Sequence, residues 1–137
     1  MKFMEDILTK LKILLIIDAV AAFVFCFFYL FITDIYLIEL ADWSYPDPYY
    51  PRAFGGTLLV LGIFALLATR KEKWEQIKIY FELIISWMSI ILILNILEII
   101  FIKITPIYMF HTILDSIILI LLIVINIYYY LKQIKKS

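Results

Sequence analysis

The sequence predicts an all-α integral membrane protein, a bundle of four transmembrane helices with both termini on the cytoplasmic side. Three observations predict this class. Hydrophobic residues make up 66% of the 137 residues and the mean hydropathy is +1.04, whereas a soluble domain is roughly half apolar. The apolar residues form four long runs. Ten of the twelve basic residues flank those ends of the runs that are expected on the same side of the membrane. The length supports a single domain, residues 1–137.

Each apolar run is long enough to cross a bilayer as a helix. A hydrocarbon core of about 30 Å requires about 20 apolar residues in helical form, because lipid offers the backbone no hydrogen-bond partner. Runs such as Leu58 to Ala68 are apolar on every side, unlike the one-sided stripe of a soluble bundle. We therefore expect four transmembrane helices, at residues 13–32, 53–69, 79–102 and 107–131.

The first helix follows Lys10 and Lys12 and is expected to be an uncleaved anchor. A signal peptide would need a short apolar stretch before a small-residue site such as Ala19 to Ala21. Asp18 interrupts that stretch, and apolar sequence continues well past the site. Asp18 is therefore expected inside the membrane.

The segment at residues 33–52 is expected to be the only substantial loop, on the outer side. Its prolines, Pro46, Pro48 and Pro51, push the preceding residues toward extended or turn conformations, so we expect no helix from Trp43 to Arg52. Its tryptophan and tyrosines favour the headgroup region. We interpret the loop as an aromatic belt with stiff turns, and the alternative is a dedicated ligand lid.

The second helix carries small residues toward one side. Gly55 and Gly62, with Ala65 and Thr69 nearby, permit a neighbouring helix to approach the backbone closely. Tight helix packing is the predicted consequence.

Orientation follows from lysine and arginine, because these residues resist translocation. The loop after the second helix is basic, as are both tails, whereas the other two loops contain only Arg52 and Lys103. Both tails are therefore expected in the cytoplasm. The ten inner basic residues are Lys2, Lys10, Lys12, Arg70, Lys71, Lys73, Lys78, Lys132, Lys135 and Lys136.

Polar residues near the outer end of the third and fourth helices form the main candidate site. Asn95 and Glu98 are three residues apart, and His111 and Asp115 are four apart, so each pair shares a helix face. A charged group at the membrane centre costs at least about 2.5 kcal/mol and normally faces other helices. Arg52, at the entrance to the second helix, is expected to be the counter-ion. The set predicts either a polar pocket that binds a ligand headgroup or exchanges protons, or an ion-paired cluster that fixes helix order.

A second, sparser polar set is expected toward the inner side. Its members are Asp18, Glu82, Ser86 and Asn126. Asn126 lies on the same side of the fourth helix as His111 and Asp115, so a continuous polar line through the bundle is conceivable. An interhelical hydrogen bond from a protonated Asp18 is the simpler interpretation of that residue.

The motif Arg52-Ala53-Phe54-Gly55-Gly56 opens the second helix after a proline-containing loop. With the four-span plan, this motif resembles the small DoxX-like membrane proteins. The resemblance implies a compact four-helix bundle. Functions in that family are mostly unassigned, and some members are associated with quinone-linked redox complexes. Arg52, Gly55 and Gly56 are the positions that the resemblance carries over.

The sequence contains no Walker A loop, no His-Glu-x-x-His, no Gly-x-Ser-x-Gly and no Cys-x-x-Cys. With one cysteine, Cys26, and one histidine, no internal disulfide, metal site or cofactor is expected. The formal net charge is zero, and nothing in it suggests a nucleic-acid partner.

We expect a multi-pass protein of the cell (plasma) membrane that is more plausibly a binding protein than an enzyme. It would contact membrane lipid and bind a lipid-like or amphiphilic molecule, or serve as a subunit of a homo-oligomer or a larger membrane complex. Two alternatives are open. Asp18, Glu82, Glu98, His111 and Asp115 suit transport of protons or a small solute. Isomerase-like acid/base chemistry would use His111 with Glu98 or Asp115.

Overall fold

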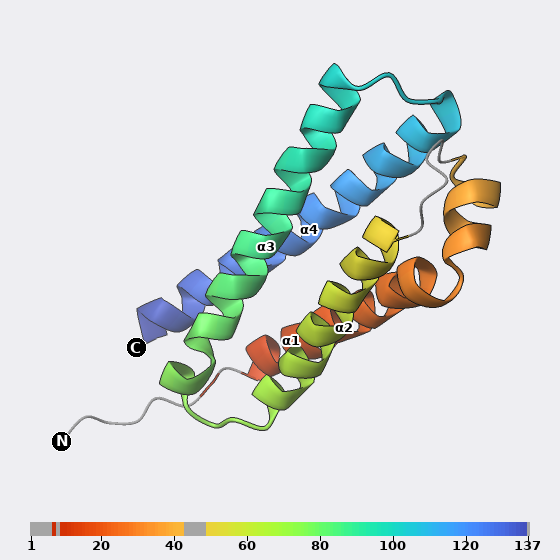
Figure 1. The fold of residues 1–137 in the computed structure, drawn as a ribbon. Helices are drawn as coiled ribbons and strands as arrows, with labels where there is room; N and C mark the ends of the chain where they lie inside the picture. The colour runs from red at the N-terminus through yellow and green to blue at the C-terminus, as the bar shows by residue number, and fades with distance from the viewer. Residues whose placement is uncertain (1–6, 8, 43–48, 137) are drawn as a thin grey trace.

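The structure is a computed structural model that describes Ile7, residues 9–42 and residues 49–136. Within these ranges the chain is almost entirely helical and has no β-strand (Figure 1). Four helices are long and apolar enough to cross a membrane, which confirms the predicted class, an all-α membrane bundle. The helical segments are α1 (Thr9–Cys26), η1 (Phe27–Phe31), η2 (Asp34–Leu40), α2 (Tyr49–Thr69), α3 (Trp74–Phe101) and α4 (Pro106–Lys136).

The membrane-spanning helices extend beyond the apolar runs from which they were predicted. α1 continues directly into η1, so that the first apolar segment covers Thr9–Phe31. α4 begins at Pro106, where the missing N–H of proline would have no intrahelical partner. The backbone N–H of Tyr108 donates to the Thr105 hydroxyl oxygen (3.3 Å), which satisfies another free N–H of the first turn.

The stretch at residues 33–52, expected to be a loop, is partly helical. η2 occupies Asp34–Leu40, so the expected loop is wrong there. α2 begins at Tyr49, so the expected absence of helix is wrong from Tyr49 to Arg52. Pro51 is compatible with α2 because it lies in the first turn, where backbone N–H groups have no partner within the helix. Residues 43–48, which include the tryptophan and two prolines of the predicted aromatic belt, lie outside the described residues.

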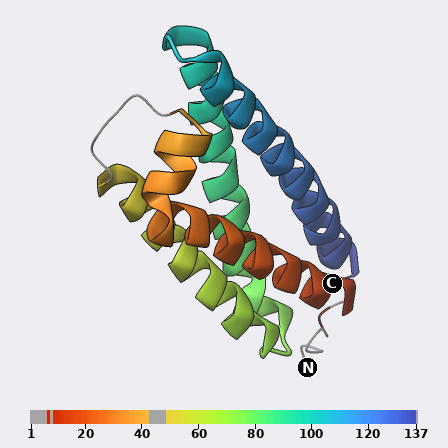
Figure 2. The ribbon, with the colours of Figure 1, turned by 90° about the vertical axis from the view of Figure 1, so that its right-hand side faces the viewer.

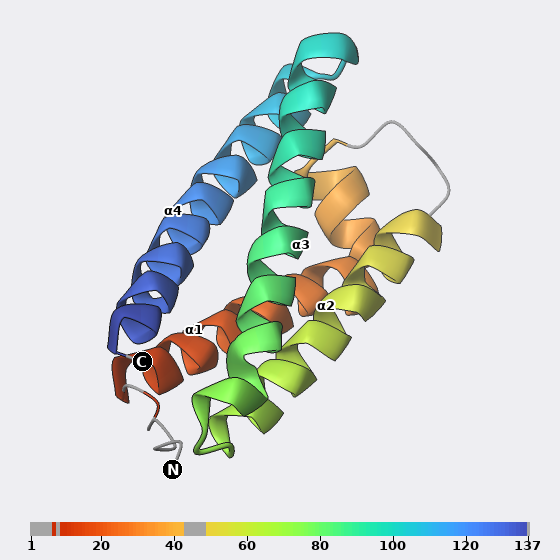
Figure 3. The same cartoon turned by 90° about the vertical axis from the view of Figure 1, so that its left-hand side faces the viewer.

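The helices form two antiparallel hairpins, α1 with α2 and α3 with α4 (Figure 1). The hairpins meet at the end that carries the start of α1, the α2–α3 connection and the end of α4, where α1 also contacts α4. They diverge toward the opposite end, and η2 stands between them there (Figure 2 and Figure 3). The described part of the chain is therefore a wedge with η2 at its wide end.

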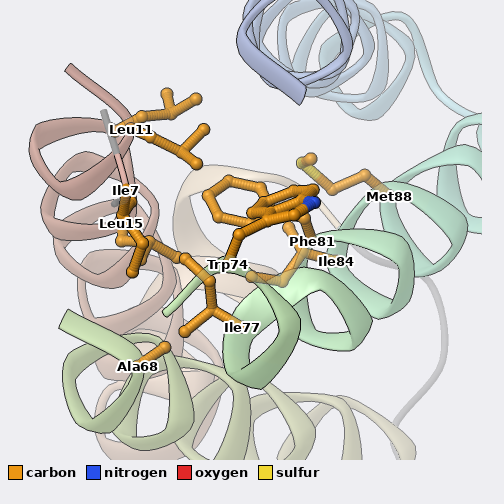
Figure 4. Packing of buried hydrophobic residues seen from close by; sticks show 10 residues of the cluster. Ile7, Leu11, Leu15, Ala68, Trp74, Ile77, Phe81, Ile84 and Met88 are labelled. Atoms are coloured by element: carbon orange, nitrogen blue, oxygen red, sulfur yellow. The ribbon is translucent and has the colours of Figure 1, made fainter. Parts of the chain in front are cut away.

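Buried apolar side chains fill the narrow end of this wedge (Figure 4). Leu11 and Leu15 of α1 and Ile77 and Phe81 of α3 are fully buried. The Trp74 ring contacts both Phe81 and Tyr130, at centroid distances of 6.1 and 5.5 Å, and so brings α4 into the cluster. The buried cluster consists of Ile7, Leu11, Leu14, Leu15, Ala68, Trp74, Ile77, Phe81, Ile84 and Met88.

Outward faces of the long helices are apolar, and several polar side chains are inside. Phe101 is 77% exposed and Ile79 is 68% exposed, whereas Asn126 is completely buried. A soluble bundle shows the opposite distribution. This one suits lipid, which dissolves apolar surface and leaves polar groups to be satisfied between helices.

Two glycines of α2 allow it to lie directly against α1 and η1. A Cβ atom at Gly55 would be 3.0 Å from the backbone nitrogen of Leu30, and one at Gly62 would be 2.8 Å from the Phe23 ring. A Cβ atom at Gly56 would have no neighbour within 4 Å. The predicted close approach is confirmed at Gly55 and Gly62.

η1 and η2 have wide helical turns that direct tyrosines inward. Each ends in a hydrogen bond that spans five residues, from Ile32 N–H to the Phe27 carbonyl (3.3 Å) and from Ala41 N–H to the Tyr36 carbonyl (2.8 Å). The Tyr36 ring packs against that of Tyr29, with centroids 5.5 Å apart. η2 is therefore folded back onto the bundle.

Candidate functional site

Four of the five residues predicted at the outer end line one cavity. They are Asn95 and Glu98 of α3, and His111 and Asp115 of α4. The cavity has a volume of about 40 Å³, enough for a few water molecules. The helix pairing explains this convergence, because α3 ends and α4 begins at the wide end of the wedge. We call this space the outer cavity.

Three tyrosines complete the outer cavity, and the sequence analysis did not select them. Tyr29 comes from η1, Tyr36 from η2 and Tyr108 from α4. Tyr108 lies beside Glu98, close enough for the two side chains to interact. Its spacing from His111 was a usable signal, since residues three apart share a helix face. No comparable signal marked the other two, because wide helical turns set their directions.

Hydrogen bonds from small side chains connect α3 and α4 beside the outer cavity. The Asn95 amide donates to the Ser116 hydroxyl oxygen at 3.4 Å, and that hydroxyl donates to the Thr112 carbonyl at 2.7 Å. The Thr112 hydroxyl in turn donates to the Tyr108 carbonyl at 3.0 Å. Asn95 is thus oriented by α4, and its position depends on that helix.

Tyr36 keeps its proton at any physiological pH. Burial, together with the negative charge of Asp115, raises the pKa of Tyr36 to about 12, although a hydrogen bond with Tyr29 opposes the increase. The ring lies edge-on to His111, with centroids 6.1 Å apart. η2 therefore presents a neutral hydroxyl and an aromatic face to the outer cavity.

Arg52 is not the counter-ion of these acids. Its guanidinium Nη2 is 4.0 Å from Asp34 Oδ2 at the start of η2, and both side chains are at least half exposed. It lines neither of the two cavities described in this section. The expectation that Arg52 would neutralise Glu98 or Asp115 is wrong, because η2 supplies a nearer, solvent-accessible carboxylate.

A larger cavity lies between the two hairpins, and we call it the central cavity. It has a volume of about 110 Å³, and side chains of α1, η1, α2, α3 and α4 line it. Most of its walls are apolar. They include Ala21, Ala22, Phe25, Phe54, Leu58, Leu61, Ala65, Ile84, Trp87, Met88, Ile91, Ile118, Leu119 and Leu122.

Polar groups stand where the central cavity adjoins the outer one. Tyr29, Asn95 and Asp115 line both cavities, so these three side chains form their common boundary. Asp18 is the other acidic residue of the central cavity. The space therefore has apolar walls, a polar boundary with the outer cavity and a further carboxyl group on α1.

Asp18 pairs with Asn126, which links α1 to α4. The Asn126 amide nitrogen donates to Asp18 Oδ1 at 3.0 Å and to the Leu122 carbonyl at 2.9 Å. Asp18 is 7% exposed and Asn126 is fully buried. Within the described residues, Asp18 Oδ2 and Asn126 Oδ1 are buried without a hydrogen-bond partner. The interhelical bond predicted for Asp18 is present, with Asn126 as the observed donor.

Glu82 and Ser86, the other predicted inner residues, face away from both cavities. Glu82 accepts a hydrogen bond from the Tyr130 hydroxyl (2.7 Å) and lies 3.8 Å from the Lys78 ammonium group, with its side chain half exposed. Ser86 is exposed on the outward face of α3. These two residues are therefore no part of a polar line through the bundle. The cavities instead connect the outer polar residues with Asp18.

Among the residues that the structure describes, no three histidine, cysteine, aspartate or glutamate side chains gather closely enough to hold a metal ion. Fold and site together define a small multi-pass membrane protein with an internal cavity. In comparisons with known protein families, curated proteins and solved structures, the chain matched none of them. The DoxX-like resemblance stays a prediction.

Proposed function

We propose that this protein binds a small amphiphilic molecule within the membrane, in the central cavity. The polarity of that cavity is the observation that carries the proposal. Apolar side chains from all four long helices enclose it, while Asp18, Asn95 and Asp115 place polar groups on its walls. Sites for small molecules usually combine mostly apolar walls with a few polar groups that orient the ligand.

The size of the cavity limits what it can hold. An apolar cavity of about 150 Å³ accommodates benzene. The central cavity, at about 110 Å³, is somewhat smaller but partly open, so it suits a single ring or a short alkyl chain whose remainder extends out of it. The ligand, or the part of it that the bundle encloses, is correspondingly small.

The same geometry gives less support to transport or acid/base catalysis. Transport requires a route to both sides of the membrane, yet the apolar cluster around Phe81 packs the narrow end of the wedge. His111, Glu98 and Asp115 do face one space, as an isomerase would need. That space holds only a few water molecules, so binding in the larger cavity is the better-supported function.

Filling the central cavity should abolish binding of a small neutral amphiphile. We choose benzyl alcohol as the probe, since it has one ring and one hydroxyl group. It should raise the midpoint of thermal unfolding saturably in the native protein but not in Ala22→Leu, whose larger side chain occupies the cavity. Ala53→Leu adds the same volume at an exposed position of α2 and should keep the effect. An equal, unsaturable response in all three proteins would contradict the proposal.

We infer that the protein lies in the cell membrane with the narrow end of the wedge in the cytoplasm. Ten of the twelve basic residues belong to segments at or near that end, by their order along the chain. Basic residues are retained on the cytoplasmic side because they resist translocation. In the structure, the start of α1, the α2–α3 connection and the end of α4 lie at the same end (Figure 1).

Single cysteines test this orientation. Glu39→Cys in η2 should react with a membrane-impermeant maleimide in intact cells, because Glu39 is exposed at the wide end of the wedge, which the proposal places outside the cell. Lys71→Cys in the α2–α3 connection should react only after the membrane is opened. The native protein is the control, since Cys26 is 2% exposed and should stay unlabelled. Labelling of Lys71→Cys, but not Glu39→Cys, in intact cells would show the reverse orientation.

A further inference from the structure

The two cavities are lined by acidic groups without a lysine or arginine. Asp18 and Asp115 line the central cavity, and Glu98 and Asp115 line the outer one. His111, in the outer cavity, is the one basic side chain in either lining. Any fixed charge on the walls of the central cavity is therefore negative, and its complement is a positively charged group.

One carboxyl oxygen of Asp18, buried beside the central cavity, has no hydrogen-bond partner in the described structure. This oxygen is Oδ2, since Oδ1 accepts the hydrogen bond from Asn126. A buried oxygen left unpaired is unfavourable, so a ligand that donates a hydrogen bond to it is bound more tightly. Asp115 differs, because it also lines the outer cavity together with His111, which lies one turn earlier on α4. Asp18 is thus the acidic residue whose carboxyl group can accept a further hydrogen bond.

Aromatic rings supply the rest of a cation site. Phe25, Tyr29, Phe54 and Trp87 line the central cavity. The rings of Phe54 and Trp87 stack, with centroids 5.5 Å apart and planes inclined by 19°. Ring faces attract cations, and the attraction is stronger where water is excluded. A group with a positive charge and an apolar body would use both the carboxyl group and these walls.

We propose that the ligand of the central cavity is a small organic amine whose ammonium group is held by Asp18. This inference rests on the proposed binding function and specifies its ligand class. In apolar surroundings a carboxyl group is favoured in its uncharged form. An amine that enters in its neutral form takes the Asp18 proton: the O–H bond breaks, an N–H bond forms, and an ammonium–carboxylate pair results. The Asn126 amide stays bonded to Oδ1 and holds the carboxylate in place.

Three probes of matched size test the charge preference. Benzylamine, benzyl alcohol and benzoate share one ring and differ in the charge of the attached group. We would titrate each into the full chain in phosphatidylcholine nanodiscs, which carry no net charge, and measure affinity by calorimetry. Benzylamine should bind at least about tenfold more tightly than benzyl alcohol, as a charged hydrogen bond implies, and benzoate should not bind.

Variants of the two acids then assign the preference to one residue. Asp18→Asn should reduce benzylamine affinity to that of benzyl alcohol measured in the same variant. Asp115→Asn should retain the preference. Loss of the preference in Asp115→Asn alone would overturn the assignment to Asp18.

The native protein alone also decides the matter if either variant fails to fold. Equal affinities for benzylamine and benzyl alcohol would refute the amine inference while leaving the binding function intact. No saturable binding of any of the three probes would refute both.

Discussion

Replacing Gly55 with leucine is expected to destabilise the protein by about 2–3 kcal/mol, whereas Gly56→Leu should leave its stability almost unchanged. At Gly55 a new side chain would meet the backbone of Leu30 and Tyr29 at 3.0–3.1 Å, and backbone atoms cannot rotate away. Overpacking of this kind typically costs about 1–3 kcal/mol. Gly56 has no neighbour within 4 Å of an added Cβ, so the change there mainly improves helix propensity.

Equilibrium unfolding in mixed detergent micelles, followed by far-ultraviolet circular dichroism, measures both variants. The two positions are adjacent on one helix and receive the same side chain, so the added volume and hydrophobicity are matched, whereas Gly55 is buried and Gly56 is partly exposed. Gly55→Leu should also weaken binding of benzyl alcohol, because displaced η1 would carry Tyr29 away from the cavity boundary. Equal stability of the two variants would show that α2 does not pack against η1 as the structure has it.

Hydropathy was sufficient to predict the four helices, since few backbone conformations can cross a membrane. Lipid requires every backbone group to be bonded within the span, and only a long apolar helix does this in an α-helical chain. This requirement does not apply to residues 33–52, which were expected to lie outside the spans. There, proline was treated as a helix breaker, yet Pro51 lies in the first turn of α2, where it is harmless. η2, with its irregular turns, left no periodic signal.

Helix periodicity also predicted part of the candidate site. Residues three or four apart share a face, which correctly paired Asn95 with Glu98 and His111 with Asp115. Which helix faces which neighbour is a matter of tertiary packing. For this reason Arg52 was assigned to the wrong acids, although Asp34 is its actual neighbour.

Charge alone overestimated how many polar residues point inward. Glu82 was placed inside because it is ionisable and lies in an apolar run. It lies close enough to the helix end for Lys78 and Tyr130 to hold it at an exposed position. Asp18 lies at a similar distance from the start of α1, but it points between the helices, where the Asn126 amide donates to one of its oxygens. The side of the helix on which each acid lies, rather than residue type, separates the two cases.

Phe81→Ala is expected to be the most damaging substitution in the apolar cluster, at about 3 kcal/mol of unfolding free energy. The ring is fully buried and contacts Trp74, so its removal leaves a void that neighbours fill only partly. Because lipid is as apolar as the protein interior, the loss comes mainly from packing rather than from transfer to water. The void would adjoin the central cavity, since Ile84 and Met88 belong to both the cluster and the cavity wall.

Phe101→Ala separates the loss of packing from the effect of transferring the ring, because it removes the same ring from a side chain that is 77% exposed on α3. There lipid replaces the lost contacts, and the expected change is within about 0.5 kcal/mol. The same micelle unfolding experiment compares the two variants directly. Similar losses at both positions would mean that burial against lipid, and not packing at the narrow end, stabilises the bundle.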